Sequence, residues 1–325
     1  LSLVLILTLS GQSVARAEGG FLEKLKERRE ARKEGSANAG DTSRRSERGE
    51  RGSKRGGKVD PATLPAGTKI IKDLSYGTDA LQKMDVYAPA VSKDAPIIIM
   101  VHGGGWKRGD KGGEHMVTEK VKYWQPKGYI FVSINYRLHP AVDLPTEAND
   151  VATALALVQQ KAASWGGNPD KIIMMGHSAG AHLVSYLSAN PALAEKAGAK
   201  PWSGTVSLDS AMLNAVEQMT DKPYKILSTK IYDEVLGTDQ DYWKLVSPYH
   251  QLTSDSIPIY IVCSSKRKDA CPQGYAFAKK AESLGGKASV LEQNLSHGEI
   301  LGNLGKPGAY TDSVDQAMTR MLEGR

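Results

Sequence analysis

The stretch KIIMMGHSAGAHLVSYL, residues 171–187, decides the fold of this chain. Residues 171–175 are mostly apolar and predict a buried strand, and residues 179–187 predict the helix that follows it. Between them, Gly176-His177-Ser178-Ala179-Gly180 fits the pattern Gly-x-Ser-x-Gly, in which a serine lies on a sharp turn from strand to helix. Glycine is needed on both sides because a side chain there would clash. The stretch therefore predicts a serine hydroxyl presented at the end of a strand.

A second motif, His102-Gly103-Gly104-Gly105-Trp106, stands earlier in the chain, directly after an apolar β-branched run at residues 97–101. It fits the glycine-rich loop that accompanies such a serine turn and supplies backbone N–H donors to a developing oxyanion. Each motif alone is a weak signal. The two together, in this order and each behind a predicted strand, are a strong one.

From residue 69 onward, apolar runs alternate with helical patterns, which is typical of a mostly parallel sheet with helices on both faces, an α/β fold. Helical spacing is clearest over residues 149–162. Strands are expected at residues 97–101, 129–135, 171–175, 205–208, 257–262 and 288–291. Residues 209–256 form a long stretch without a regular pattern, and because such loops are usually functional we interpret this one as a lid or pocket wall.

A serine becomes a good nucleophile when a histidine accepts its proton and a carboxylate orients that histidine. With this type of turn the three residues follow in the order Ser, acid, His. Among the 7 histidines, His297 is favoured because it lies in the loop just after the last predicted strand, and His250 is the alternative.

The carboxylate is expected in the loop after the strand at residues 257–262, where Asp269 is the acidic residue. The alternative for Asp269 is a surface ion pair, since Lys266, Arg267 and Lys268 precede it. Asp255 and Asp233 are then the fallback acids.

Backbone N–H groups of Gly104, Gly105 and Ala179 are the expected oxyanion donors. Trp106 either lines the pocket or packs beneath it. A phosphate-binding role for the glycines is excluded, because no Gly-Lys-Ser/Thr follows.

Cys263 and Cys271 bracket Asp269. In an exported protein they would form a disulfide that fixes this loop, and the alternative is two buried reduced thiols. No cofactor is expected, and the residue spacing favours no metal site.

The N-terminal part has a different composition. Residues 1–9 are apolar and Ala15-Arg16-Ala17 fits a secretory cleavage site, so residues 1–17 are expected to be a signal peptide lacking its start, in a secreted or periplasmic protein. The apolar run is shorter than the ~20 residues of a membrane span.

Residues 18–58 hold 13 Lys and Arg against 8 Asp and Glu and predict a disordered basic linker. This linker either contacts an anionic surface electrostatically or is a solvated spacer. Residues 59–325, the expected catalytic domain, hold 28 of each sign, so their composition gives no case for nucleic-acid binding.

Five segments resemble the bacterial carboxylesterases of the α/β-hydrolase superfamily, including its hormone-sensitive-lipase-like and feruloyl-esterase-like branches. They are residues 81–89, 102–111, 132–138, 176–183 and 296–300. The resemblance implies a triad of Ser178, Asp269 and His297. Two departures stand out: many relatives have Asp where this chain has His177, and many place the acid about two residues nearer the strand.

The function expected from this resemblance is that of a serine carboxylester hydrolase, which acts through an acyl-enzyme on small or aryl esters. The run Gly-His-Ser-Ala-Gly-Ala-His, residues 176–182, also resembles arylformamidases, so an amide or formamide hydrolase is the alternative activity. A catalytically silent binding module is the alternative from another class.

Overall fold

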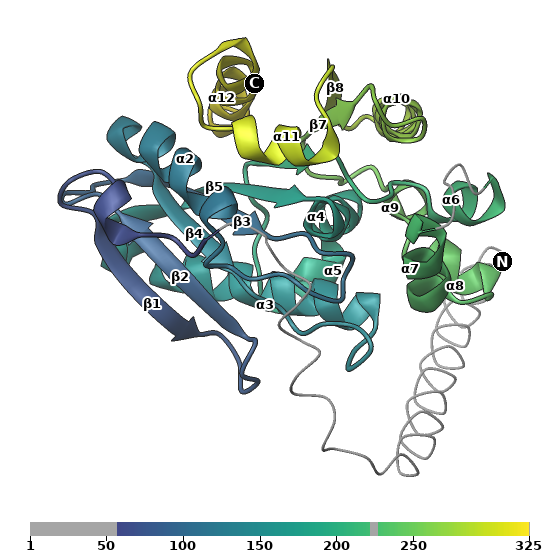
Figure 1. The fold of residues 1–325 in the computed structure, drawn as a ribbon, viewed down its shortest axis with the longest axis horizontal. Coiled ribbons are helices and arrows are strands. Elements are labelled where there is room, and N and C mark those ends of the chain that lie inside the picture. Colours follow the sequence, from purple (N-terminus) through teal and green to yellow (C-terminus); the bar gives the residue numbers. More distant parts are fainter. Residues whose placement is uncertain (1–56, 222–226, 325) are drawn as a thin grey trace, which may run out of the picture. The chain divides into compact units, whose positions relative to one another are not determined.

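The computed structural model describes residues 57–221 and 227–324. These residues build an eight-stranded sheet with the order β1-β2-β4-β3-β5-β6-β7-β8 (Figure 1). The strands are β1 (Lys69–Ser75), β2 (Lys83–Ala88), β3 (Ala95–Val101), β4 (Ile130–Ile134), β5 (Gly167–His177), β6 (Gly204–Leu208), β7 (Ile259–Ser264) and β8 (Ala288–Gln293). From β4 to β8 neighbouring strands run parallel, whereas β2 is antiparallel to both β1 and β4. The expected mostly parallel α/β sheet is therefore confirmed.

Helices cover both faces of the sheet (Figure 1). One face packs on α3 (Leu144–Lys161), α4 (Ala179–Ala189) and α5 (Ala192–Glu195), with α10 (Ala270–Ser283) near β7. The other face packs on α2 (Glu114–Trp124), α11 (His297–Asn303) and α12 (Ala309–Leu322). Alternate residues of β3 enter the two cores, as a strand buried on both faces requires. Three short 3-10 helices are η1 (Pro61–Thr63), η2 (Gln125–Lys127) and η3 (Ala162–Trp165).

The segment between β6 and β7 is more regular than the sequence indicated. It contains α6 (Ala215–Asp221), α7 (Leu227–Leu236), α8 (Gln240–Leu245) and α9 (Pro248–Gln251). Local capping explains why short helices form here: the Asp239 side chain accepts from two N–H groups at the start of α8, and Pro248 occupies the first turn of α9. Three of these helices are too short to show a full apolar period, whereas α7 has one, with apolar or aromatic residues at 227, 231, 232, 235 and 236.

The expected signal peptide and all but the last two residues of the expected linker lie outside the described residues. Those last two, Gly57 and Lys58, form backbone contacts with the folded domain. The Gly57 carbonyl accepts from Glu114 N–H, and Lys58 forms an isolated antiparallel β-bridge with Gly113. A search of the described residues for a helix of membrane-spanning length and apolarity finds none.

The central strand gives a direct test of where the core lies. Replacing the fully buried Ile99 of β3 by Ala is expected to lower the free energy of unfolding by about 2–5 kcal/mol, because it removes buried methylenes and leaves a cavity. The matched control is Val91→Ala, since that side chain is 87% exposed; its effect should stay within ~0.5 kcal/mol. Urea unfolding followed by tryptophan fluorescence measures both, and equal effects would contradict the assignment of β3 to the core.

Candidate active site

Ser178 occupies the turn between β5 and α4, and its backbone is strained, with φ 56° and ψ −117°. The surrounding chain leaves no room for side chains. A Cβ on Gly176 would lie 2.3 Å from the Gly180 carbonyl oxygen, and a Cβ on Gly180 would lie 2.2 Å from that of Val101. The predicted requirement for glycine on both sides of the serine is thus met by the packing of β3 against the elbow.

His297 is the first residue of α11 and lies beside the elbow. Ser296 caps this helix and forms a reciprocal capping box with Glu299, which fixes where the helix begins. The Nε2–H of His177 donates to the His297 carbonyl oxygen at 2.9 Å, and the two imidazole rings lie 4.5 Å apart. Burial, and then the nearby His297, lower the pKa of His177 to about 3, so His177 is a neutral donor. The structure therefore brings His297 next to the residue that precedes Ser178.

Within the described residues, Ser178 Oγ makes no hydrogen bond, including none to His297. Hydrogen bonds between nucleophile and base are often loose in the absence of substrate and tighten when it binds. The structure therefore bears on this pair through position: both side chains lie at the same end of the sheet.

Asp209 is the carboxylate that holds His297. It follows β6 directly, and its Oδ2 accepts from His297 Nδ1 at 2.5 Å, while its Oδ1 accepts from Ser264 N–H at 2.9 Å. Burial raises the pKa of Asp209, but the hydrogen bond from His297 and the charge of Arg267 outweigh this and bring the pKa to about 2. Asp209 is therefore ionised at neutral pH although its side chain is inaccessible to water.

The structure corrects the prediction that Asp269 orients the histidine. Asp269 is buried at the start of α10, and its Oδ2 accepts from Arg267 Nη2 at 3.0 Å. The physical reason is that Arg267 lies between the two carboxylates and pairs with both, while only Asp209 reaches the imidazole. The alternative reading of Asp269 as an ion-pair partner is closer to the structure, although the pair is buried. The fallback residues Asp233 and Asp255 are exposed.

A signal for Asp209 was present in the sequence. It is the first residue after the strand predicted at residues 205–208, and the carboxyl ends of parallel strands meet at one edge of the sheet. Sequence reasoning placed Asp209 at the start of the lid segment and so overlooked it.

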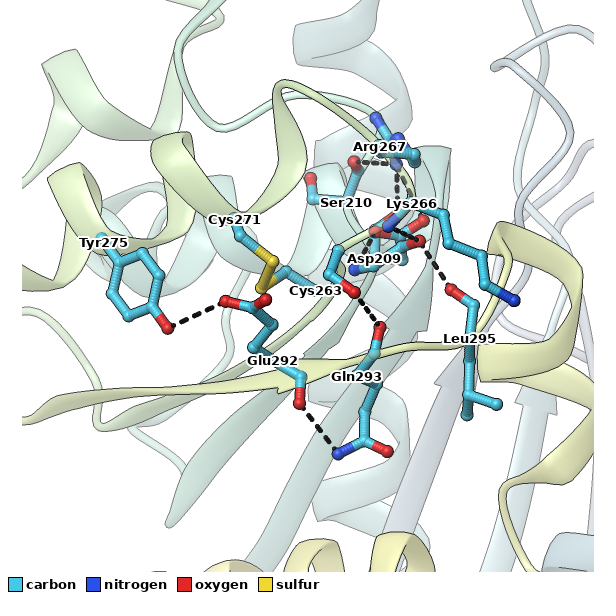
Figure 2. The surroundings of a disulfide bond; sticks show 12 residues. Asp209, Ser210, Cys263, Lys266, Arg267, Cys271, Tyr275, Glu292, Gln293 and Leu295 are labelled. Atoms are coloured by element: carbon cyan, nitrogen blue, oxygen red, sulfur yellow. Dashed lines mark hydrogen bonds and ion pairs between the residues drawn. A yellow bond between two sulfur atoms is a disulfide. The ribbon is translucent and has the colours of Figure 1, made fainter.

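Cys263 and Cys271 form the disulfide that was one of the two expectations for this pair. The bond closes the loop after β7 (Figure 2). In this loop the Ser264 N–H donates to Asp209 and the Ser264 hydroxyl donates to the Leu295 carbonyl at 2.6 Å, just before His297. The closed loop therefore supports Asp209 and the His297 segment, in addition to enclosing Asp269.

The glycine-rich loop after β3 lies against the elbow. A Cβ on Gly103 would lie 2.8 Å from Ser178 Cβ, and Gly104 and Gly105 have φ values of 126° and 64° that favour glycine. The His102 Nδ1–H donates to the Gly103 carbonyl at 2.8 Å, a contact within the loop. In the described chain the N–H groups of Gly104, Gly105 and Ala179 donate no hydrogen bond, so they remain available to an oxyanion.

Trp106 packs beneath the loop rather than lining an open pocket, since it is 1% exposed. Its Nε1–H donates to His182 Nδ1 at 3.2 Å, and the His182 Nε2–H donates to the Val246 carbonyl at 2.8 Å. Burial lowers the pKa of His182 to about 4, consistent with this neutral tautomer. Trp106 also meets Tyr232 of α7 edge-on, and Lys107 pairs with Glu234 of the same helix. The segment between β6 and β7 is thus attached to the oxyanion loop.

Comparison with known proteins agrees with this geometry. The family described as BD-FAE matches residues 84–271, which is more than half of the chain. This match shows that the chain belongs to the BD-FAE family, and the eight-stranded sheet with its serine elbow has the α/β-hydrolase fold.

Individual relatives point the same way. Esterase LipQ of Mycobacterium tuberculosis is 30% identical over 211 residues, which cover 60% of this chain and 48% of that protein. Carboxylesterase NlhH of the same species is 29% identical over 189 residues, covering 55% of this chain and 56% of that protein. The chain thus spans less than two thirds of the length of these curated relatives.

Solved structures share the fold. A truncated carbohydrate esterase from gut microbiota superimposes with a TM-score of 0.67 at 18% identity, over 82% of this chain and 100% of that one. Esterase B from Lactobacillus rhamnosis gives a TM-score of 0.61 at 22% identity, over 80% of this chain and 87% of that one.

The pKa of Asp209 predicts how its contribution to stability depends on pH. The folded-state pKa is depressed, so the stabilisation is complete above the unfolded-state pKa near 4 and is lost as the pH falls through the folded value of about 2. The difference in free energy of unfolding between the wild type and Asp209→Asn should therefore shrink by ~1 kcal/mol between pH 6 and pH 3. Urea titrations at each pH measure it, and a difference independent of pH would contradict the assigned ionisation.

Proposed function

We propose that this chain is a serine carboxylester hydrolase that acts through an acyl-enzyme, with Ser178 as nucleophile, His297 as general base and Asp209 as the orienting acid. The observation that carries the proposal is the 2.5 Å hydrogen bond between the buried Asp209 carboxylate and His297 Nδ1, beside a strained serine elbow. Family membership and the esterase relatives support the same reaction class.

In the first half of the reaction, Ser178 Oγ attacks the ester carbonyl carbon and its proton passes to His297 Nε2. The bond to Asp209 holds the Nδ1 proton in place, so that Nε2 is the basic nitrogen, and the carboxylate stabilises the imidazolium that forms. Negative charge develops on the former carbonyl oxygen. The N–H groups of Gly104, Gly105 and Ala179 stabilise this charge by hydrogen bonds. Each donor of this type typically lowers the activation barrier by ~3 kcal/mol.

In the second half, the tetrahedral intermediate collapses as His297 returns the proton to the departing alkoxide oxygen. The products of this step are the free alcohol and an acyl ester on Ser178. Water then attacks that ester with His297 again acting as base, which releases the carboxylic acid and restores the serine hydroxyl.

The proposed substrates are small or aryl esters. The basis is the apolar wall over the oxyanion loop: Ile231 would lie 3.3 Å from a Cβ on Gly105, and Tyr232 packs on Trp106. Such a wall favours an apolar acyl or aryl group over a charged one.

Export is part of the proposal. The signal-like pattern at residues 1–17 lies outside the described residues, and its support inside them is the Cys263–Cys271 disulfide, because disulfides persist mainly in oxidising compartments. Contact of the basic residues 18–58 with an anionic surface is proposed on their charge alone.

Substitution of the nucleophile tests the activity. Ser178→Ala should lower kcat/KM for p-nitrophenyl acetate at least ~10³-fold, because it removes the atom that forms the acyl-enzyme, while circular dichroism stays unchanged. The control is Ser254→Ala, an exposed serine, which should hydrolyse the ester as the wild type does.

A fluorophosphonate probe and a formanilide extend this test. Labelling of the wild type but not of Ser178→Ala is expected, and an unlabelled wild type would point to a silent binding module. If kcat/KM is higher for the formanilide than for the matched ester, the activity is formamide hydrolysis and not ester hydrolysis.

A second pair of variants separates the two carboxylates. Asp209→Asn should lower kcat about 10³–10⁴-fold, because an amide cannot hold the productive tautomer of His297. Asp269→Asn, which makes the same chemical change at a neighbouring buried site, should lower kcat by no more than ~10-fold. Steady-state kinetics at pH 8 measure both, and the reverse ranking would reinstate Asp269 as the orienting acid.

A further inference from the structure

Arg267 makes an unusual set of contacts at the rear of the site. Its Nη1 donates to Asp209 Oδ2 at 3.0 Å, to the Asp209 carbonyl at 3.2 Å and to the Ser210 carbonyl at 2.9 Å. Its Nη2 donates to Asp269 Oδ2 at 3.0 Å. Figure 2 shows the guanidinium beside Ser210 and Asp209, and 15% of the side chain is exposed. A cation this close to the orienting acid is part of the electrostatics of the site.

The same carboxylate oxygen serves two donors. Asp209 Oδ2 accepts from His297 Nδ1 and from Arg267 Nη1, and these two nitrogens lie 3.4 Å apart. The guanidinium contact therefore fixes the position of the oxygen that the imidazole binds.

Arg267 also holds the backbone of Asp209. Asp209 has a φ of 45°, a conformation that costs a non-glycine residue about 1–3 kcal/mol and persists only when its surroundings enforce it. The two carbonyl contacts of Arg267 lie on this turn, at Asp209 and Ser210. One guanidinium thus fixes both the main chain and the carboxylate of the orienting acid.

Asp269 explains why Arg267 keeps this position. It precedes α10, within the loop that the Cys263–Cys271 disulfide closes, and its buried Oδ2 accepts from the second guanidinium nitrogen. A buried Arg–carboxylate contact of this kind fixes the direction of the guanidinium plane. The other carboxylate oxygen of Asp269 has no hydrogen-bond partner in the described chain, so this contact is the side chain's polar anchor.

We propose that Arg267, anchored by Asp269, is a positioning residue that fixes Asp209 in its strained turn, with its carboxylate oxygen directed at His297 Nδ1. This inference rests on the proposed function, since it deepens the role of the same site. It gives Asp269 a defined task that differs from orienting the histidine.

Several charged or titratable groups lie near His297. Asp209 follows β6, Arg267 and Asp269 follow β7, and His177 ends β5. Lys120 of α2 lies farther away, donating to the Leu301 carbonyl of α11, and Glu299 lies on the same helix as His297. Among these, Arg267 is the cation whose nitrogen comes within 3.4 Å of His297 Nδ1.

The experiment compares three variants of the full chain. Arg267→Gln with Asp269→Asn removes the guanidinium together with its buried partner, whose pKa burial raises to about 7, and so avoids leaving two buried carboxyl groups without a cation. Arg267→Lys keeps the charge and loses the planar fork. The control is Lys268→Gln, which removes the same charge from an exposed residue of the same loop.

The readout is kcat and KM for p-nitrophenyl acetate at pH 8. The double variant should lose about 10-fold in kcat with KM unchanged, because the carboxylate no longer holds His297 for proton transfer while the groups that bind the ester are untouched. Arg267→Lys should also lose kcat at unchanged KM, because an ammonium lacks the planar fork. Lys268→Gln should match the wild type in both.

A measurement without turnover separates this inference from the proposed function. The His297 Nδ1–H resonance is recorded by NMR in the Ser178→Ala background, with and without the double substitution, and assigned by comparison with His297→Asn. The double substitution is expected to weaken or abolish this downfield signal, because the Asp209–His297 hydrogen bond loses its support. If the wild type hydrolyses no ester, the proposed function fails while this signal still decides the role of Arg267. An unchanged signal together with an unchanged kcat would overturn the inference.

Discussion

The hydrogen bond between Asp209 and His297 is the interaction on which the site depends. It joins the end of β6 to the start of α11, two segments separated by the whole of β7 and β8 in the chain. Because Asp209 is buried and its pKa lies at about 2, the carboxylate stays charged and holds the Nδ1 proton of the imidazole. Ser264 N–H and the Arg267 guanidinium, both from the end of β7 and the loop after it, offset the cost of burying this charge.

Two strained residues share this edge of the sheet. Ser178 and Asp209 both have positive φ values, and their backbones are connected, since Ser178 N–H donates to the Leu208 carbonyl and Ala211 N–H donates to that of Ser178. Such conformations persist where the surroundings over-determine them, and here the surroundings are the crowded glycines of the elbow and the guanidinium of Arg267. The nucleophile and the orienting acid are therefore held by one hydrogen-bonded unit.

The sequence was sufficient for the fold class, the elbow and the position of His297, because each rests on a local pattern: apolar runs, spaced glycines and a residue after a strand. It was insufficient for the acid. Asp209 and Asp269 both follow strands of the parallel sheet, and the choice between them depends on where one arginine side chain lies. The helices of the β6–β7 segment also escaped prediction. α8 depends on its Asp239 cap rather than on periodicity, whereas α7 has an apolar period that was overlooked.

A crystal structure of the fluorophosphonate-treated protein tests the central claim most directly. The account predicts phosphorus bonded to Ser178 Oγ, the phosphoryl oxygen within hydrogen-bond distance of the N–H groups of Gly104, Gly105 and Ala179, and His297 Nδ1 bonded to Asp209. Phosphorus on another residue, or His297 paired with Asp269, would contradict it.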